Sequence, residues 1–322
     1  MKDGKTSVLD RVLVLEMVRV TEAAALAASE WIGRGNEREA DAAAVEAMRR
    51  AFNRLPISGR VVIGEGERDE APMLYIGEEV GLGGQEVDIA LDPLEGTTLT
   101  AKMSPNALAV LAIAERGNLL HAPDVYMDKI AVGPGYERGI VGLDRSPEEN
   151  VEALAAARGC RCEEVTVCVL DRVRHEDLIS RLRKVGARIV LIPDGDIAGV
   201  IATTDPATRI DMYLGIGGAP EGVLAAAALN CVGGQFQGRL LFRNDEERDR
   251  ARRIGIEDLD RLYELQDLAR GDTIFAATGV TDGSMLRGVR HNKRGFQTHS
   301  VVMRASSGTV RWIETEHLRK PV

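Results

Sequence analysis

Two carboxylates, Asp92 and Glu95, directly follow an apolar, strand-like run over 87–91 in the stretch Asp92-Pro93-Leu94-Glu95-Gly96-Thr97-Thr98. Both side chains would emerge at the carboxyl end of a strand, where open α/β sheets bind ligands, and hard oxygen ligands suit a divalent cation. Gly96 lets an anion approach the backbone, and Thr97 offers a hydroxyl where a helix would begin. The spacing predicts metal-assisted phosphate chemistry. The alternative is an ordinary polar turn, because Asp-Pro and Glu-Gly are common turn dipeptides.

A second candidate ligand, Glu65, stands between Gly64 and Gly66 after the strand-like run 61–63. The flanking glycines let the backbone bend so that the carboxylate can point into a cleft. The alternative is an exposed acidic loop. We predict metal binding for Glu65 and ordinary solvation for the acids that follow it, which are Glu67, Asp69 and Glu70.

Two further carboxylates, Asp41 and Glu221, are ambiguous from their local sequence. Asp41 lies among small and apolar residues typical of a closely packed helix, and Glu221 follows Pro220 at the start of an alanine-rich segment. Each carboxylate either faces a site or only favours the positive end of a helix dipole. The glycine-rich approach over 215–218 strengthens the case for Glu221.

Other candidate ligand-binding residues follow later strand-like runs. Asp194-Gly195-Asp196 stands between a strand pattern and a helix pattern, where backbone N–H groups suit phosphate or sugar hydroxyls. The same aspartates are also good helix caps. Arg172 and Arg174 carry the multi-donor fork that binds phosphate, with a solvated helix start as the alternative. Tyr126 suits stacking on a ligand or simple burial.

The elements that must position these side chains follow from hydrophobic periodicity. Helical spacing predicts one helix within 9–32 and a second from Glu37, and Val/Ile-rich runs predict buried strands near 61–63, 87–91 and 107–114. After about Pro147 the pattern becomes a β-α-β series with parallel strands. Its predicted elements are helix 148–158, strand 165–170, helix 175–185, strand 187–192, helix 195–202, strand 209–214 and helix 221–231, with strands near 273–277 and 298–304 beyond them.

The change of pattern predicts an α/β fold in two packed halves that share an active-site cleft. Residues 1–150 would form a metal-binding half and residues 151–322 a substrate-binding half. A chain of 322 residues is long enough for one large or two intimately packed domains.

Composition excludes several classes of function. The net charge of −9 argues against a nucleic-acid surface, and no apolar run is long enough for a membrane span. The first residues carry no signal-peptide pattern, so we expect a cytoplasmic protein. The four cysteines lack paired CxxC spacing and are expected to be reduced thiols.

Several long motifs in order closely resemble the class II fructose-1,6-bisphosphatases, within the lithium-sensitive, inositol-monophosphatase-like phosphatase superfamily. They are Val61-Val62-Ile63-Gly64-Glu65-Gly66-Glu67, Asp69-Glu70-Ala71-Pro72-Met73-Leu74-Tyr75, Asp92-Pro93-Leu94-Glu95-Gly96-Thr97, Pro193-Asp194-Gly195-Asp196 and Gly215-Ile216-Gly217-Gly218-Ala219-Pro220-Glu221-Gly222. The resemblance covers nearly the whole chain. It implies that superfamily's layered αβαβα fold and a Mg²⁺- or Mn²⁺-dependent sugar bisphosphatase.

The resemblance also implies residue roles. Asp41, Glu65, Asp92, Glu95 and Glu221 match the family's metal-ligand positions. The catalytic group would be Thr97, Glu65 and Asp92, with Thr97 orienting the attacking water. The substrate-contact regions match Glu95, Gly96, Thr97, Tyr126, Arg172, Val173, Arg174, Asp194, Gly195, Asp196 and Gly218. Val173 stands where the family commonly carries Pro, which bears on the geometry of the loop around Arg172 and Arg174.

The implied reaction is hydrolysis of fructose 1,6-bisphosphate to fructose 6-phosphate and phosphate, a step of gluconeogenesis, by a cytoplasmic homodimer or homotetramer. The alternative is a sedoheptulose-1,7-bisphosphatase or an enzyme that acts on both sugars. From another class, the chain could be a non-catalytic sugar-phosphate-binding regulator, against which the intact carboxylate set and Thr97 argue.

Overall fold

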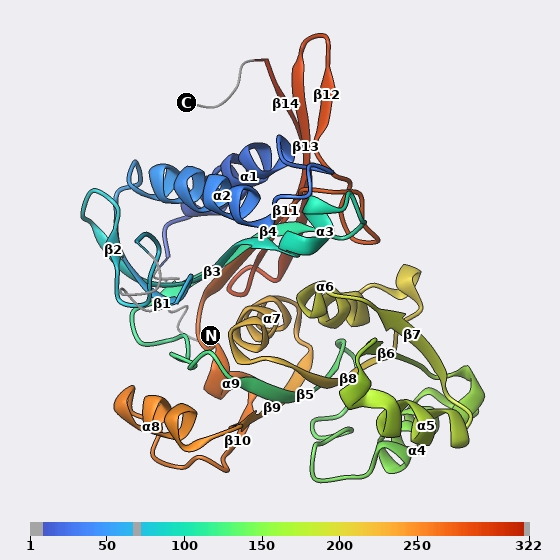
Figure 1. Cartoon of the computed structure of the whole chain (residues 1–322). Coiled ribbons are helices and arrows are strands. Elements are labelled where there is room, and N and C mark those ends of the chain that lie inside the picture. The colour runs from blue at the N-terminus through green and yellow to red at the C-terminus, as the bar shows by residue number, and fades with distance from the viewer. Residues whose placement is uncertain (1–8, 67–71, 319–322) are drawn as a thin grey trace, which may run out of the picture. The chain divides into compact units, whose positions relative to one another are not determined.

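Backbone contacts divide the chain into two compact units (Figure 1). The computed structural model describes residues 9–66 and 72–318, so Glu67, Asp69 and Glu70 lie outside the described residues. The first unit contains described residues up to Leu120 and again from Ala269, and the second unit is His121–Leu268. The sequence predicted one division near residue 150. That position instead lies inside α4 (Pro147–Arg158). The difference arises because β11 (Thr273–Gly279) pairs with β4 (Leu108–Glu115) and returns the C-terminal segment to the first unit.

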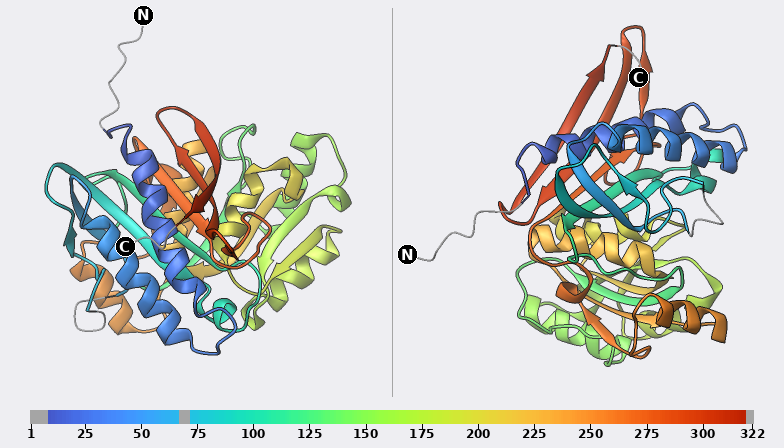
Figure 2. Two further views of the ribbon diagram at one scale, coloured as in Figure 1. Left: turned by 90° about the horizontal axis from the view of Figure 1, so that it is seen from above. Right: turned by 90° about the vertical axis from the view of Figure 1, so that its left-hand side faces the viewer.

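The first unit is a mixed sheet with two long helices on one face. Its strand order is β12-β13-β11-β4-β3-β1-β2, and β14 pairs with β13. Helices α1 and α2 lie side by side (Figure 2), and they bury apolar side chains in the same core as the sheet. The other elements of this unit are α1 (Leu13–Ser29), α2 (Glu37–Phe52), β1 (Ile57–Ile63), β2 (Glu79–Val80), β3 (Gln85–Glu95), α3 (Thr97–Ala101), β12 (Arg290–Asn292), β13 (Gly295–Arg304) and β14 (Thr309–His317).

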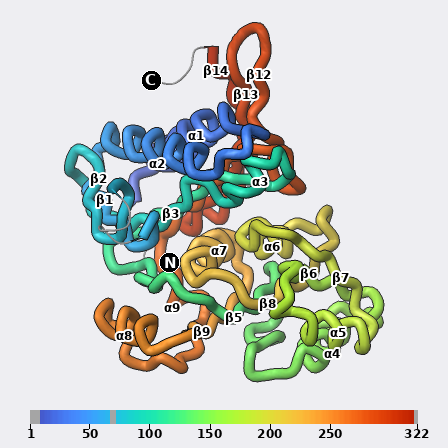
Figure 3. Tube along the Cα trace, in the orientation of Figure 1, coloured from blue at the N-terminus to red at the C-terminus, as the bar shows by residue number. Residues whose placement is uncertain are grey.

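The second unit has helices on both faces of a sheet with the order β10-β9-β5-β8-β6-β7. The tube in Figure 3 follows this unit from β5 to α9. Its other elements are β5 (Tyr126–Val132), η1 (Cys162–Glu164), β6 (Thr166–Leu170), η2 (Val173–His175), α5 (Glu176–Lys184), β7 (Arg188–Ile192), α6 (Asp196–Ile201), η3 (Ala202–Thr204), η4 (Pro206–Thr208), β8 (Met212–Gly218), α7 (Ala219–Val232), β9 (Gln235–Leu241), α8 (Asp245–Arg253), β10 (Leu262–Glu264) and α9 (Leu265–Leu268).

Side-chain alternation assigns the helices of the second unit to opposite faces of its sheet. Val167 and Val169 of β6 share a core with α4 and α5. Cys168 points the other way, and its Sγ lies against Gly199 of α6. On that same face, Gly222 of α7 lies against Met127 of β5. The face that carries α6 and α7 therefore also carries the two candidate acids of these helices, Asp196 and Glu221.

The mixed α/β class is confirmed, and most predicted elements form. Parallel pairing in the β-α-β series is confirmed for β6 with β7 and for β6 with β8. Local signals explain the helix ends: Ser146 and Glu149 form a capping box at the start of α4, with Pro147 in its first turn. Among the described residues, no helix combines the length and apolar character needed to cross a membrane.

Candidate active site

The first acidic group lies where β3 ends. The register of β3 against β4 shifts between Asp92 and Glu95, so the strand carries a bulge there. The Asp92 carboxylate accepts a hydrogen bond of 3.0 Å from the Leu94 N–H, and Glu95 is buried. Gly96 has φ +89°, a left-handed conformation that favours glycine, and it ends the strand so that Thr97 begins α3. The bulge and the glycine turn hold both carboxylates and the Thr97 hydroxyl in one short segment.

Glu65 lies beside this segment because β1 and β3 are parallel neighbours. Ile63 pairs with Ala90, so Glu65 and Asp92 each stand two residues beyond paired positions. The loop closes tightly behind Glu65, whose N–H donates to the Leu74 carbonyl at 3.0 Å. A Cβ at position 64 would lie 2.1 Å from that same carbonyl oxygen, so glycine is required there. Glu65 therefore follows the end of a strand, as the sequence predicted.

Asp41 approaches Glu65 from helix α2. The helix begins after Asn36, whose side chain accepts a hydrogen bond from the Glu39 N–H, and α2 contacts both β3 and α3. Burial raises the pKa of Asp41. Burial, and secondly the negative charge of Asp41, raise the pKa of Glu65 to about 8. Two carboxylates whose charged forms are disfavoured in this way form a pair that a divalent cation would stabilise.

This pair predicts a stability effect in the metal-free protein. An acid whose folded pKa lies above its unfolded value loses stability as pH rises between the two, here from about 4.5 to about 8. Glu65→Gln should therefore raise the melting temperature in excess chelator at pH 8.5, by roughly 5 °C. At pH 4.5 the two proteins should melt together, as scanning fluorimetry would show. An equal or lower melting temperature for Glu65→Gln at pH 8.5 would contradict a buried, repelled carboxylate.

In the second unit, the candidate residues gather at one edge of the sheet. The parallel strands β6, β7 and β8 all end there, and the antiparallel strand β5 begins there, with Tyr126 paired to Gly218. Asp194 follows β7, and its carboxylate lies 3.8 Å from the guanidinium of Arg172, which follows β6. Gly195 has φ +81° and turns the chain into α6, which starts at Asp196. The prediction that Asp194, Gly195 and Asp196 stand between a strand and a helix is thus confirmed.

A buried charge cluster lies immediately inside this edge. The Lys129 side chain is only 1 % exposed, and its Nζ contacts the Asp196 carboxylate and donates to the Gly218 carbonyl at 2.8 Å. A Cβ at position 218 would lie 1.9 Å from the Glu221 Oε2, so glycine lets that carboxylate lie against the backbone. Burial, followed by the charge of Asp196, raises the pKa of Glu221 to about 7, although Lys129 opposes the shift.

These clusters fit a divalent cation. Glu221 Oε2 is buried and accepts no hydrogen bond from the described part of the chain, and the single Lys129 ammonium faces both Asp196 and Glu221. Hard carboxylate oxygens are the ligands that such cations prefer. Within residues 9–66 and 72–318, no three His, Cys, Asp or Glu side chains lie together as a metal-binding group. Of the predicted ligands, Asp41, Glu65, Asp92 and Glu95 belong to the first unit and Glu221 to the second.

Basic residues surround Tyr126 at the same edge of the second unit. The Arg174 guanidinium lies 4.9 Å from the Tyr126 ring centre and donates to the Ile216 carbonyl from Nε and Nη2. The neighbouring His175 is buried, and its Nε2 accepts from the Ile216 N–H at 2.8 Å. Its Nδ1 therefore carries the proton and donates to the Leu170 carbonyl at 2.7 Å. His175 thus joins the ends of β6 and β8 and fixes Arg174.

Val173, which stands where proline was expected from the resemblance, is 82 % exposed as the first residue of η2. The 3-10 turn forms without proline because the His175 N–H donates to the Arg172 carbonyl at 2.8 Å. Val173 stays a predicted substrate contact, and the turn to which it belongs places Arg174 against Tyr126.

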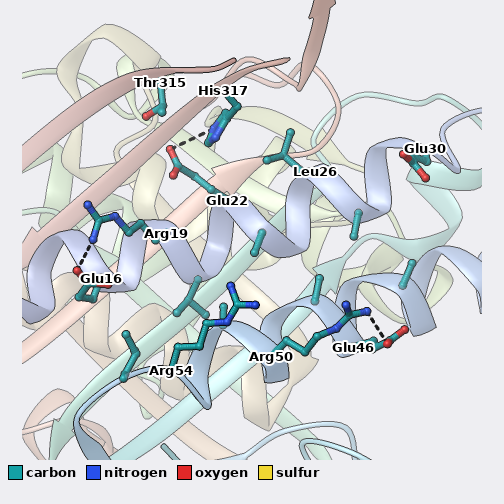
Figure 4. A pocket seen from close by; sticks show the side chains of 17 residues that line it. Glu16, Arg19, Glu22, Leu26, Glu30, Glu46, Arg50, Arg54, Thr315 and His317 are labelled. Atoms are coloured by element: carbon teal, nitrogen blue, oxygen red, sulfur yellow. Dashed lines mark hydrogen bonds and ion pairs between the residues drawn. The ribbon is translucent and has the colours of Figure 1, made fainter. Parts of the chain in front are cut away.

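Each unit contains a cavity that described residues line. One, of about 720 Å³, lies between α1 and α2 and is lined by alanines and by charged side chains, of which Figure 4 labels Arg19 and Arg50 among others. Its Arg19 and Arg50 pair with Glu16 and Glu46, and none of the predicted site residues lines it. The other, of about 330 Å³, is lined by Arg174 and His175 and lies in the second unit. The predicted chemistry therefore concentrates at the sheet edges rather than in the alanine-lined cavity.

Two candidate functional residues, Lys129 and Arg243, were not predicted from the sequence. Lys129 lies inside a strand that alternation alone did not identify, and Arg243 follows β9, which was not predicted. The glycine-rich stretch 215–218, opposite Lys129 in the register of β5 and β8, was the available signal for Lys129. No signal marked Arg243, because only the antiparallel order of β9 and β5 brings it to Tyr126.

Comparisons with known proteins agree with this chemistry. The family described as bacterial fructose-1,6-bisphosphatase, glpX-encoded, matches residues 11–317. A protein of Synechococcus sp. (strain JA-3-3Ab) named D-fructose 1,6-bisphosphatase class 2/sedoheptulose 1,7-bisphosphatase is 46 % identical, over 97 % of both chains. A protein of Trichodesmium erythraeum (strain IMS101) with the same name is 44 % identical, over 96 % of this chain and 97 % of its own length.

A more distant likeness is to a solved inositol monophosphatase from Anabaena (Nostoc) sp. PCC 7120. It has a TM-score of 0.33 and 16 % identity, over 63 % of this chain and 74 % of the other, which is too little to support an argument.

The strand-end carboxylates and the family match together define a phosphoric monoester hydrolase. The chain belongs to the family of bacterial fructose-1,6-bisphosphatases of the glpX type. Membership of this phosphatase family implies a requirement for a divalent metal.

Proposed function

We propose that this chain hydrolyses fructose 1,6-bisphosphate to fructose 6-phosphate and inorganic phosphate. The observation that carries the proposal is the separation of charge at one sheet edge of the second unit. There Lys129 pairs with the Asp196 carboxylate and its charge also acts on Glu221, while Arg172 and Arg174 lie on one loop of the same edge. An acidic, cation-binding end and a basic end suit a sugar with two phosphates. The family match supports the same substrate class.

In this proposal, Asp41, Glu65, Asp92, Glu95 and Glu221 hold Mg²⁺ or Mn²⁺. The bound cation supplies charge neutralisation for the scissile phosphate and lowers the pKa of a water molecule. The Thr97 hydroxyl orients the attacking water, and a neighbouring carboxylate accepts its proton. Water then adds to phosphorus as the bond from phosphorus to the sugar oxygen breaks, and that oxygen takes up a proton from solvent to become a hydroxyl. Arg172, Arg174 and Tyr126 bind the distal phosphate, and Asp194, Gly195, Asp196 and Gly218 contact the sugar.

Thr97→Ala tests the role of the hydroxyl. Thr97 is the first residue of α3 and is half-buried, so losing its hydroxyl should leave the helix in place. We expect the maximal rate to fall by about a hundredfold, with a smaller change in KM. The adjacent Thr98→Ala is a matched control and should keep near-normal kinetics. A Thr97→Ala effect confined to KM would argue against water orientation.

The function itself is tested by phosphate release from a panel of substrates. The panel contains fructose 1,6-bisphosphate, sedoheptulose 1,7-bisphosphate and inositol 1-phosphate, each assayed with Mg²⁺, Mn²⁺ or a chelator. Metal-dependent release from fructose 1,6-bisphosphate supports the proposal. Binding of sugar phosphates without release in any metal would instead support a non-catalytic regulator.

A second candidate function is action on both sugars. The observation that favours it is that relatives 46 % and 44 % identical carry both activities in their names. Comparable release from sedoheptulose 1,7-bisphosphate in the same panel would establish it. We further propose that the protein is cytoplasmic and forms a homodimer or homotetramer. Light scattering of the purified protein would check the number of subunits.

A further inference from the structure

Two guanidinium groups approach one aromatic ring in the second unit. The Cζ atom of Arg174 lies 4.9 Å from the ring centre of Tyr126, and that of Arg243 lies 5.3 Å from the same centre. The two arginines come from different loops, since Arg174 follows β6 and Arg243 follows β9. Both loops reach this edge because Tyr126, the first residue of β5, pairs with Gly218 on one side and with Leu241 on the other.

Both arginines are fixed by contacts of their guanidinium groups with the protein. Arg174 is fixed by the Ile216 carbonyl. Arg243 donates from Nε to the Glu247 carboxylate at 2.7 Å, and its backbone N–H donates to the same carboxylate at 2.7 Å. The Glu247 side chain is only 3 % exposed and is anchored on α8, while the Arg243 side chain is 61 % exposed. A buried acid therefore orients an exposed guanidinium.

A purely structural role does not account for this arrangement. An arginine that only capped Glu247 could extend into solvent, whereas Arg243 lies over the ring that Arg174 also approaches. Glu247 offsets part of the positive charge that the two arginines bring to this ring, and an anion bound beside the ring would offset the rest. Planar guanidinium forks on exposed loops suit the oxygens of a phosphate.

We propose that Arg243 is a further substrate-binding residue, which holds the distal phosphate together with Arg174 across the Tyr126 ring. This inference rests on the proposed function, because it deepens the distal-phosphate end of the same site. Arg243 sets the preference for a sugar that carries a second phosphate, and Glu247 is the positioning residue that orients it.

The test separates the two phosphates of the substrate by calorimetry. Fructose 6-phosphate carries only the distal phosphate, and fructose 1-phosphate carries only the scissile one. In the presence of Mg²⁺, Arg243→Gln should weaken binding of fructose 6-phosphate by about tenfold or more, as expected for loss of a charge-assisted hydrogen bond. Its binding of fructose 1-phosphate should be unchanged. Glu247→Gln should weaken fructose 6-phosphate binding by a smaller factor.

Arg248→Gln is the matched control, because Arg248 lies over Phe242 on the same segment and is not part of the proposed site. It should bind both ligands as the wild type does, and melting curves establish that each variant is folded.

The outcomes distinguish the inference from the function on which it rests. If Arg174→Gln weakens fructose 6-phosphate binding and Arg243→Gln does not, the inference is overturned and the proposed function stands. Equal weakening of both ligands by Arg243→Gln would also overturn it, since the effect would not be specific to the distal phosphate. If the wild type binds neither ligand, the proposed function itself fails.

Discussion

Asp92→Asn is expected to lower the maximal rate of phosphate release by roughly a thousandfold or more, the scale seen when one stabiliser of transition-state charge is removed. Asp92 lies opposite Val110 near the end of β3, beside the bulge that also places Glu95. The asparagine keeps a side-chain oxygen, so it can still accept the 3.0 Å hydrogen bond from the Leu94 N–H that shapes the turn. Only the negative charge is lost, and the fold should remain intact.

The experiment combines turnover with a measurement that does not depend on activity. Phosphate release and the rise of melting temperature on adding Mn²⁺ are compared for the wild type, Asp92→Asn and Glu86→Gln. Glu86 is exposed on the same strand, so its neutralisation should change neither quantity. Asp92→Asn should lose most of both. Retention of more than about a tenth of the wild-type rate would remove Asp92 from the metal-binding chemistry.

The positions of the candidate acids at strand ends could be predicted because strand ends are local features of the sequence. An apolar run followed by a turn and an acid, as at Asp92, Glu65 and Asp194, needs only the strand itself to place the acid at a sheet edge. Asp41 and Glu221 could not be settled from local patterns, since a helix N-terminus favours acids for its own reasons. The packing of each helix decides the orientation of these two side chains. Local sequence does not encode that packing, so only the family resemblance implied a metal-binding role for them.

The parts that were not predicted depend on long-range pairing. β5 lies between β9 and β8 and runs antiparallel to both, an order that no local period encodes. Arg243 and Lys129 acquire their neighbours from that order. The same reason explains the domain boundary: the pairing of β11 with β4 joins segments about 160 residues apart in the chain. The hydrophobic pattern changes near residue 150 because the β-α-β series begins there, and this position lies inside the second unit rather than at its boundary.

The two units share one electrostatic property. In each, carboxylates are buried beside another carboxylate, which raises the pKa of Glu65 to about 8 and that of Glu221 to about 7. Such groups lower the stability of the metal-free fold and are found where binding requires them. Only the second unit contains a buried lysine in contact with its acids, among the residues that the structure describes. Lys129 should therefore make a large contribution to the stability of that unit.

Lys129→Met should lower the free energy of unfolding by about 3–5 kcal/mol, the cost of breaking a buried ion pair by removing one partner. Methionine fills similar space, so the loss comes from the charge and the hydrogen bonds rather than from a cavity. The Asp196 carboxylate, 6 % exposed, would keep the weak 3.4 Å hydrogen bond from the Tyr213 hydroxyl but lose its contact with the ammonium group. Glu221 would also lose the positive charge that opposes the rise of its pKa.

A double-mutant cycle measured by urea unfolding in chelator separates the ion pair from general disruption. Lys129→Met/Asp196→Asn should recover most of the stability, because it removes the Asp196 charge together with its partner and also removes the repulsion between Asp196 and Glu221. Lys184→Met, the same substitution at an exposed position of α5, should stay within about 0.5 kcal/mol of the wild type. If the double variant is no more stable than Lys129→Met, the ion pair is not the source of the loss. Mn²⁺ should stabilise Lys129→Met more than the wild type, since a cation can then neutralise the two carboxylates that lysine no longer balances.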